Sequence, residues 1–255
     1  MTTVLRTDKL RREFGDLVAV DDVSLAIDQD DITSIIGPNG AGKTTFYNLL
    51  TGVLEPTSGS VSLRTDGELR DVTDDPPHEI ARKGLSRSYQ ITNVFDRLTV
   101  RENVQVARIA HEKRTLDFRS RAADNDALNA DVDELLELTN LSDLSETTCD
   151  MLSHGEKRNV EIALALAIEP TVFLLDEPTA GMNPTETERI VSLIHELDAD
   201  LDATFVVTEH DMTVVRDISD RIVVLDDGSV LADGDPESVL TDERVTEAYL
   251  GSDAT

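Results

Sequence analysis

The sequence predicts an α/β fold with a mainly parallel sheet, and three observations lead to that prediction. Short apolar segments of strand length alternate with helix-like segments in the C-terminal half. A glycine-rich segment, residues 37–42, joins an apolar strand to a helix. A polar block in the middle of the chain interrupts the alternation and reads as an inserted helical subdomain. Because ligands bind at the carboxyl ends of parallel strands, we expect the functional residues to follow the strands directly.

The N-terminal part predicts a β-rich layer beside this core. Apolar residues alternate there in a strand-like pattern with a break at Asp21–Asp22: Val18, Val20, Val23, Leu25 and Ile27. Val61–Leu63 reads as a further short strand. Ile32–Ile36 predicts a buried strand that runs into the glycine-rich segment, and Thr44–Leu50 predicts the helix after it.

The middle block and the C-terminal half follow. Thr99 to Glu102 form a capping box that starts a helix, because a Thr and a Glu three residues apart can each accept a backbone N–H bond at a helix start. A polar stretch then runs from His111 to Asp131. The remaining expected elements are helices at about Val132–Leu138, Lys157–Ile168 and Thr185–Leu197, and strands at Val172–Leu175, Thr204–Thr208, Ile222–Leu225 and Ser229–Ala232, with short helices at the end.

We therefore expect a single domain over residues 1–255. Its core would comprise about residues 1–90, with the β-rich layer, and 171–235. The helical subdomain would occupy about residues 91–170, and C-terminal helices residues 236–255.

Composition excludes several classes of function. The chain has 255 residues, 52 acidic and 23 basic, so its formal net charge is 23 − 52 = −29. A field of that sign repels nucleic acid and anionic lipid, so we expect no nucleic-acid partner. No apolar run reaches membrane-spanning length, and the N-terminus lacks the apolar segment of a secretory signal, which favours a cytoplasmic protein. The single cysteine, Cys149, allows no internal disulfide.

The acidic residues are spread along the whole chain rather than held in one tail. Our hypothesis is a surface adapted to high salt, where screening relieves the repulsion between carboxylates. The alternative is an ordinary acidic cytoplasmic protein.

The glycine-rich segment carries a phosphate-binding motif. Residues 37–44 fit G-x-x-x-x-G-K-[ST] in full and are followed by Thr45: Gly37, Pro38, Asn39, Gly40, Ala41, Gly42, Lys43 and Thr44. The glycines let backbone amides close around phosphates, and the following helix adds the positive end of its dipole. Lys43 can reach the β- and γ-phosphates, and the Thr44 hydroxyl can ligate Mg²⁺. The alternative reading is a glycine-rich turn without a ligand.

The strand Val172–Leu175 ends in two carboxylates, Asp176 and Glu177. Asp176 is suited to hold Mg²⁺ through its water shell, and Glu177 is suited to act as the general base for an attacking water. The alternative is a strand that exits into a solvated acidic turn. Combined with the phosphate-binding motif, the pair predicts hydrolysis of a nucleoside triphosphate.

Between these motifs, Leu152-Ser153-His154-Gly155-Glu156 precedes a helix. Here the sequence resembles the ATP-binding-cassette (ABC) ATPases, whose signature is L-S-G-G-Q at a helix start. The resemblance implies the ABC ATPase fold, with a P-loop NTPase core, ATP and Mg²⁺ as ligands, and a head-to-tail dimer in which Ser153 and Gly155 serve the opposite protomer's nucleotide. His154 and Glu156 depart from the signature, which puts the backbone freedom and charge of this segment in question.

The resemblance also implies roles for residues outside these motifs. Gln90 matches the glutamine that senses Mg²⁺ and the attacking water, although it would otherwise read as a surface residue. His210 matches the switch histidine at the γ-phosphate, against the alternative of a strand-end cap. Phe14 matches the aromatic residue that stacks on adenine, against the alternative of a core phenylalanine. Asn183 stands where the family commonly has an aspartate, so its role in coupling is in doubt.

Within the family, the chain resembles the ATPase subunits of branched-chain amino-acid importers. The segments behind this are residues 36–45, Leu50-Thr51-Gly52, residues 87–90 and 98–103, Gly181-Met182-Asn183-Pro184, Glu209-His210-Asp211-Met212 and residues 247–251. The resemblance implies a peripheral subunit on the cytoplasmic face of the membrane. Its partners would be permease subunits docked near Gln90–Asn103, a second ATPase chain, identical or paralogous, and indirectly an extracellular solute-binding protein.

Other functions remain open from the sequence. ATPases of urea or amide importers and of lipopolysaccharide exporters look similar. A soluble ABC protein of DNA repair or translation is a competing class, but it usually carries two cassettes or long coiled coils. A nucleotide-binding scaffold without turnover is a third class, against which Glu177 and His210 argue.

Overall fold

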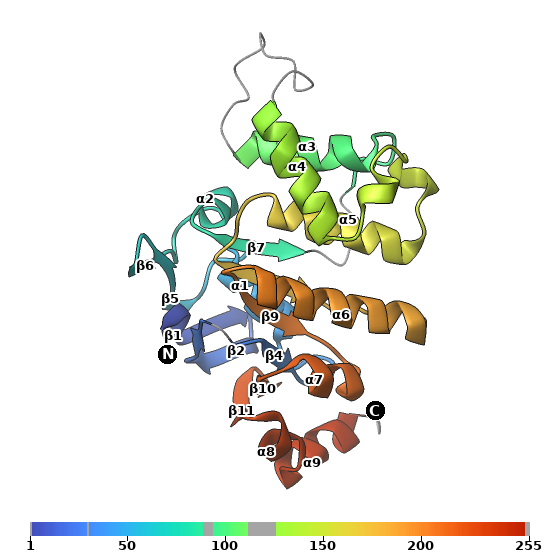
Figure 1. Cartoon of the computed structure of the whole chain (residues 1–255). Helices are drawn as coiled ribbons and strands as arrows, with labels where there is room; N and C mark the ends of the chain where they lie inside the picture. Colours follow the sequence, from blue (N-terminus) through green and yellow to red (C-terminus); the bar gives the residue numbers. More distant parts are fainter. Residues whose placement is uncertain (1, 30, 89–93, 112–125, 253–255) are drawn as a thin grey trace.

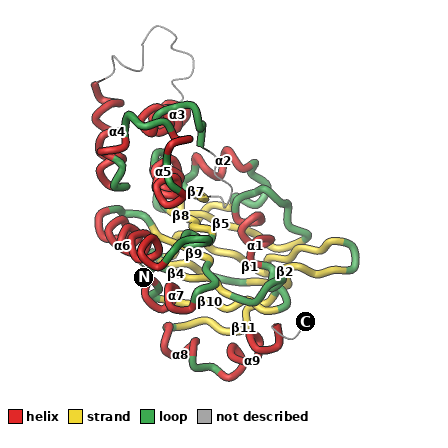
Figure 2. Tube along the Cα trace, turned by 90° about the vertical axis from the view of Figure 1, so that its right-hand side faces the viewer, coloured by secondary structure: helices red, strands yellow, loops and turns green. Residues whose placement is uncertain are grey.

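A six-stranded sheet lies at the centre of the molecule (Figures 1 and 2). The computed structural model describes residues 2–29, 31–88, 94–111 and 126–252. The order β11-β10-β4-β9-β8-β7 contains five parallel strands and one antiparallel edge strand, β11. Their bounds are β4 Thr33–Ile36, β7 Leu85–Ser88, β8 Val172–Asp176, β9 Thr204–Thr208, β10 Arg221–Asp226 and β11 Ser229–Gly234. The prediction of an α/β fold with a mainly parallel sheet is confirmed.

Both faces of the four inner strands β10, β4, β9 and β8 are buried, which explains why these strands are mostly apolar along their length. Successive side chains of a strand point to opposite faces. Leu174 therefore packs toward the N-terminal layer, whereas Phe173 and Leu175 pack beneath α6 (Pro184–Asp200) and α7 (Met212–Ile218). The predicted helix Thr185–Leu197 is found as α6, one residue longer at its start and longer at its end.

The N-terminal layer is an antiparallel sheet with the order β2-β1-β5-β6, and β3 also pairs with β1. Its strands are β1 Thr3–Phe14, β2 Leu17–Val23, β3 Ala26–Asp28, β5 Ser58–Thr65 and β6 Glu68–Asp71. Helix α1 (Lys43–Leu50) packs Phe46 and Tyr47 into the core that this layer shares with the central sheet. Helix α2 (Pro77–Arg82) leads into β7.

The sequence did not predict β1, although it is the longest strand of this layer. Its register shifts against β2, β3 and β5, and Lys9 takes a positive φ of 47° within it. Such irregularities shift the side-chain alternation, so a period of two does not run through the strand.

Three helices share a core of their own at the top of Figure 1, and one of them, α5, also packs against the central sheet. They are α3 Val100–His111, α4 Asp126–Leu138 and α5 His154–Leu166, with 3₁₀ turns at Ser142–Leu144 and Cys149–Met151. The expected bounds of two helices were wrong: α4 begins at Asp126 rather than Val132, and α5 spans residues 154–166 rather than 157–168. The capping box of α3 is confirmed, because Thr99 Oγ1 accepts from Glu102 N at 3.1 Å and Glu102 accepts from Thr99 N at 2.8 Å.

Helices α8 (Pro236–Leu240) and α9 (Glu243–Ser252) close the described chain against β10 and β11. In the described ranges, none of the helices combines the length and hydropathy that a bilayer crossing requires. Part of the expected polar stretch His111–Asp131 lies outside the described residues, as does the expected boundary near residues 90–91.

Candidate nucleotide site

The glycine-rich loop leaves the carboxyl end of β4 and enters α1. An added Cβ at Gly37 would lie 2.2 Å from the carbonyl oxygen of Leu225, and one at Gly42 would lie 2.3 Å from that of Ala19. Gly42 also has a φ of +97°, which side-chain-bearing residues rarely adopt. The first turn of α1 holds no acidic side chain. Gly37 and Gly42 therefore have no room for a side chain, and the loop leads into the positive end of the α1 dipole, which suits a phosphate. Binding of phosphate by the loop stays a prediction.

Lys43 folds back over this loop. Its Nζ donates to the carbonyl oxygens of Gly37, at 2.5 Å, and Pro38, at 3.0 Å. Burial lowers the pKa of Lys43, and the negative charges of Glu177 and Asp176 partly oppose that shift. Arg87 links the helix that follows the loop to the acidic pair, because it donates both to Asn48 Oδ1 of α1 and to Asp176 Oδ2. The structure thus brings α1 and the acidic pair together, although β9 lies between β4 and β8 in the sheet.

Asp176, at the end of β8, is held from both sides. Its Oδ2 accepts from Arg87 Nη2 at 2.6 Å, and its Oδ1 accepts from Thr208 Oγ1 at 2.8 Å. Arg87 is 5% exposed and also donates to Asn48 Oδ1 of α1 at 2.7 Å. The guanidinium lies 5.3 Å from the Tyr47 ring, within cation–π range. Sequence reasoning assigned no role to Arg87 or Thr208, which fix the carboxylate between β7, α1 and β9.

Glu177 has a left-handed backbone with a φ of 46°. For a residue with a side chain this costs about 1–2 kcal/mol. Its N–H donates to Thr208 O at 3.0 Å. Its side-chain Oε1 lies 2.6 Å from His210 Nε2, so the structure joins the predicted base and the predicted switch histidine directly.

A buried carboxylate, Glu209, links the two strands that carry these residues. It is 3% exposed. Its Oε1 accepts from Thr179 N at 2.9 Å and from Thr179 Oγ1 at 2.7 Å, and its Oε2 accepts from His210 N at 3.1 Å. Each contact is charge-assisted and therefore stronger than a neutral hydrogen bond. Glu209 thus fixes the loops after β8 and β9 relative to each other, a role that sequence reasoning missed.

Ser153 and Gly155 lie at the N-terminus of α5. Ser153 Oγ accepts from Glu156 N at 3.3 Å, and Glu156 Oε2 accepts from Ser153 N at 2.7 Å. Glu156 thus closes a capping box, a task for which Glu and Gln serve equally, which explains its departure from the signature. Within the described ranges, no hydrogen bond or ion pair joins Ser153 or Gly155 to the chain's own phosphate loop.

The second departure, His154, contacts the loop after β8. Its Nε2 lies 3.4 Å from Ala180 O, and its side chain is exposed. The third, Asn183, caps α6: Oδ1 accepts from Thr185 N at 3.0 Å and Glu186 N at 3.1 Å. Both Asn and Asp suit that position, so Asn183 keeps the cap without a charge.

Two further predicted site residues are Phe14, at the end of β1, and Gln90. Phe14 is 43% exposed, so the alternative of a core phenylalanine was wrong, and Arg12 Cζ lies 4.7 Å from its ring centre. Phe14 is the last residue of β1. Strand β2, which forms a hairpin with β1, contacts the glycine-rich loop at Ala19. Its role in adenine stacking stays a prediction. Gln90 lies outside the described residues.

The donors predicted for Mg²⁺ are Thr44, Asp176 and Gln90, of which Gln90 lies outside the described residues. The Thr44 hydroxyl and the Asp176 carboxylate supply oxygens of the kind that Mg²⁺ prefers. Thr44 is exposed at the first turn of α1. The guanidinium of Arg87 already contacts Asp176 Oδ2, which favours contact with the ion through water rather than directly. The donor chemistry therefore fits Mg²⁺.

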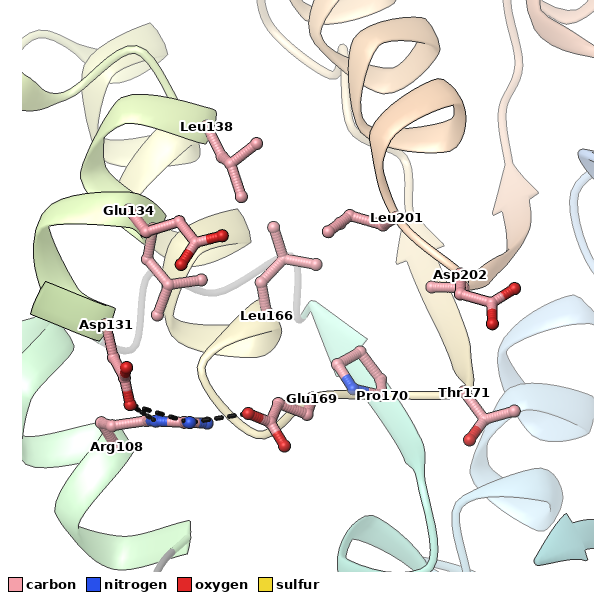
Figure 3. Close-up of a pocket in the computed structure, with 12 residues that line it drawn as sticks. Arg108, Asp131, Glu134, Leu138, Leu166, Glu169, Pro170, Thr171, Leu201 and Asp202 are labelled. Carbon is pink, nitrogen blue, oxygen red and sulfur yellow. Dashed lines mark hydrogen bonds and ion pairs between the residues drawn. The ribbon is translucent and has the colours of Figure 1, made fainter. Parts of the chain in front are cut away.

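A cavity of about 390 Å³ lies away from this site, between the helical layer and the amino end of β8. Figure 3 shows Arg108 there, with Asp131 on one side and Glu169 on the other. Its Nη2 lies 3.0 Å from Asp131 and 2.6 Å from Glu169. Because phosphate-binding groups gather at the carboxyl ends of the strands, this cavity is not the nucleotide site.

Comparison with known proteins identifies the family. The family described as "ABC transporter" matches residues 20–180, and "Branched-chain amino acid ATP-binding cassette transporter" matches residues 229–255. The chain is 38% identical to the high-affinity branched-chain amino acid transport ATP-binding protein BraF of Pseudomonas aeruginosa, over 97% of this chain and 98% of that protein. It is 39% identical to LivG of Escherichia coli, described in the same words, with the same coverage.

Solved structures extend the agreement to the fold. The ADP conformation of MJ1267, an ATP-binding cassette of an ABC transporter, superposes with a TM-score of 0.86 at 31% identity, covering 98% of this chain and 100% of that one. The lipopolysaccharide export system ATP-binding protein LptB of Haemophilus influenzae is also related, at 34% identity over 98% of each chain. The predicted resemblance is confirmed: the chain belongs to the ABC transporter family of ATP-binding proteins.

Proposed function

We propose that the chain is the ATP-hydrolysing subunit of an importer for branched-chain amino acids. The observation that carries this is the identity of 38–39%, along nearly the whole chain, to proteins named as ATP-binding subunits of high-affinity branched-chain amino-acid transport. The match of residues 229–255 to the branched-chain subgroup supports it from a segment outside the ATPase motifs.

The site residues support ATP hydrolysis by a division of tasks. The amides of the glycine-rich loop and Lys43 bind the β- and γ-phosphates. Glu177 accepts a proton from the attacking water, and His210, already 2.6 Å from its carboxylate, orients that base and contacts the γ-phosphate. Bound Mg²⁺ would neutralise charge on the phosphates, with Thr44, Asp176 and Gln90 as its holders.

The exposed N-terminus of α5 supports a two-chain arrangement. Within the described part of the chain, the amides of His154 and Gly155 have no backbone or side-chain acceptor, because the first amides of a helix lack intrahelical partners. In a head-to-tail dimer, these amides and Ser153 would complete the site of the opposite protomer. ATP would then favour the closed dimer, and hydrolysis would reopen it.

A permease would dock near residues 90–103 on the cytoplasmic face of the membrane. In the described part of that segment, Phe95 is 56% exposed. Fully buried Asn103 braces the turn beneath it, accepting from Phe95 N at 2.8 Å and donating to Phe95 O at 3.1 Å. The braced turn thus presents an apolar side chain at a fixed place, which suits a docking contact.

Co-purification and transport test this proposal. The tagged chain, purified from the membranes of its own organism, should co-purify with a permease. Proteoliposomes that contain this complex should take up leucine when ATP and a solute-binding protein are supplied. Uptake that is unaffected by ATP, or absent with leucine, isoleucine and valine alike, would contradict it. Extraction of lipopolysaccharide instead would favour the second candidate, an exporter ATPase, which the 34% identity to LptB supports.

A further inference from the structure

A buried arginine of α5 reaches the strand end that carries the predicted catalytic carboxylates. Arg158 lies in the second turn of α5, and its side chain is 7% exposed. Its Nη2 donates to the backbone carbonyl oxygen of Asp176 at 2.7 Å. Its Nη1 donates to Glu161 Oε2, also at 2.7 Å, and the Glu161 side chain is 9% exposed. Figure 2 shows α5 beside β7 and β8, which makes this contact possible.

The carbonyl of Asp176 belongs to the peptide group whose N–H is that of Glu177. Arg158 holds this peptide at its oxygen, and Thr208 O accepts from its N–H at 3.0 Å. The peptide plane is therefore fixed on both sides. Immediately after it, Glu177 takes its left-handed φ of 46°, a conformation that persists only when its surroundings enforce it.

Stability alone is a poor reason for the Arg158–Glu161 pair. Taking two charges out of water costs free energy that their attraction repays only in part, and apolar replacement of such a pair is often neutral or stabilising. A buried pair is better explained by a requirement for one geometry. Here the bond from Nη1 to Glu161 orients the guanidinium so that Nη2 donates to the Asp176 carbonyl oxygen.

We propose that Arg158 is a positioning residue for ATP hydrolysis: it holds the Asp176–Glu177 peptide so that the Glu177 carboxylate faces the attacking water. Glu161 orients Arg158 for this task. The proposal rests on the proposed function, since it concerns the same reaction.

The position of Arg158 on α5 has a consequence for a dimer. The N-terminus of α5 offers Ser153 to the opposite protomer's nucleotide, and Arg158 on the same helix holds the base of its own site. If α5 moved when its N-terminus bound the opposite protomer's nucleotide, the Glu177 carboxylate would therefore change its orientation toward the nucleotide of its own chain. The helix thus couples the two sites through one hydrogen bond to a backbone carbonyl.

Two variants test the proposal on the full chain. Arg158→Met leaves Glu161 buried without this partner and can lower stability, so it is paired with the double variant Arg158→Met/Glu161→Leu, which removes both charges. We expect the double variant to fold with a melting temperature close to that of the wild type. Its kcat should nevertheless fall at least tenfold at nearly unchanged KM for ATP, and the Hill coefficient for ATP should fall toward 1.

A second readout does not need turnover. Amide hydrogen exchange in residues 172–183 should be at least several-fold faster in the double variant than in the wild type, because the peptide at Asp176 loses one of its two anchors. Glu161→Gln retains a side-chain oxygen that can accept from Arg158, so it should recover most of the turnover. Arg108→Met is the matched control: it removes another arginine of the helical layer with two carboxylate partners, but one remote from Asp176. It should keep kcat within about twofold.

The outcomes distinguish failure of the proposed role of Arg158 from failure of the proposed function. A wild-type chain that hydrolyses ATP, with a double variant that matches it in kcat, Hill coefficient and exchange, would overturn the positioning role alone. A wild-type chain that never hydrolyses ATP, even with its permease, would overturn the proposed function. In that case, faster exchange in the double variant would still support the structural role of Arg158, and unchanged exchange would contradict it.

Discussion

The phosphate-loop region and the N-terminus of α5 differ in how their polar groups are satisfied. At the phosphate loop, the charged side chains are partnered within the chain: Lys43 with loop carbonyls, Asp176 with Arg87 and Thr208, and Glu177 with His210. At the start of α5, Ser153 and His154 are exposed, and the helix offers amides to solvent. The first region is organised by contacts within the chain, whereas the second leaves helix amides open to solvent, as the proposed contact with a second chain requires.

The contrast fits the proposed dimer, in which each chain would contribute a different half to each of two sites. Internal hydrogen bonds hold Asp176 and Glu177, the carboxylates predicted to take part in catalysis, at the end of β8, which lowers the cost of organising them at the moment of reaction. An exposed helix N-terminus costs little in the free chain because water solvates its amides. We therefore expect changes in the first region to affect chemistry and nucleotide affinity in the isolated chain. Changes in the second should weaken the dimer and, where they remove the cap of α5, the stability of the chain, but not the ATP affinity of the isolated chain.

The largest expected effect is that of Glu177→Gln. Loss of the general base should lower ATP turnover by about 10²–10⁴-fold. Because the amide keeps the shape of the carboxylate and removes its charge from the phosphates, ATP should still bind and the closed dimer should accumulate. Steady-state phosphate release and size-exclusion chromatography with ATP measure the two effects. Turnover at the wild-type rate would exclude Glu177 as the base.

Lys43→Ala tests the phosphate loop itself. Hydrogen bonds to charged groups contribute about 1.5–3 kcal/mol, so the affinity for ATP should fall by roughly ten- to a hundredfold. Titration calorimetry on the isolated chain measures it. Lys83→Ala removes a lysine that pairs with Asp75 away from the site and should leave the affinity unchanged. Equal affinities of Lys43→Ala and wild type would remove the assignment of the loop.

Ser153→Ala sharpens the contrast from the other side. The isolated chain should bind ATP as the wild type does, whereas the ATP-dependent dimer of the Glu177→Gln background should weaken by about tenfold, since one hydrogen bond to a charged group is lost. Loss of the helix cap should also cost about 0.5–2 kcal/mol of stability. Thr99→Ala removes the corresponding cap of α3 and supplies the control for that loss. A dimer equally weakened by both variants would contradict the interface role of Ser153.

The pKa of Lys43 predicts how ATP affinity depends on pH. Burial lowers this pKa in the free chain, and bound phosphates would raise it, so binding takes up protons at alkaline pH. Affinity should be constant near neutrality and fall as the pH rises through the lowered pKa of the free chain. Lys43→Ala should lack this alkaline decline, and an identical decline in both chains would contradict the assignment.

The smallest expected effect is that of salt, which acts on the stability of the whole chain rather than on the nucleotide site. With a formal charge of −29, carboxylate repulsion should be screened as the Debye length falls to about 3 Å at 1 M salt. We expect the melting temperature of the chain to rise from low to molar KCl. Equal stability at both salt concentrations would reject the hypothesis of adaptation to high salt.

Local motifs carried most of what the sequence predicted. Three features each lie within a few consecutive residues: the glycine-rich loop, the strand ending in Asp176 and the cap at Thr99. Their chemistry can therefore be predicted without knowledge of the fold. Arg87, Thr208, Glu209 and Arg158 were not predicted, because each acts on a residue far away in the chain. For Glu156 and Asn183 the signal was present: Ser153-x-x-Glu156 and Asn183-x-x-Glu186 are both capping boxes.

In the proposed dimer, one triphosphate is held by the phosphate loop and carboxylates of one chain and by the start of α5 of a second chain. Cross-linking between two chains tests this arrangement. Asn39→Cys on the exposed loop of one chain and Met151→Cys, at a side chain that is 76% exposed beside α5, on another leave buried Cys149 as the remaining thiol. In the Glu177→Gln background, a short bis-maleimide should join the two chains only when ATP and Mg²⁺ are present. A cross-link of equal yield without nucleotide, or none with ATP, would contradict the account.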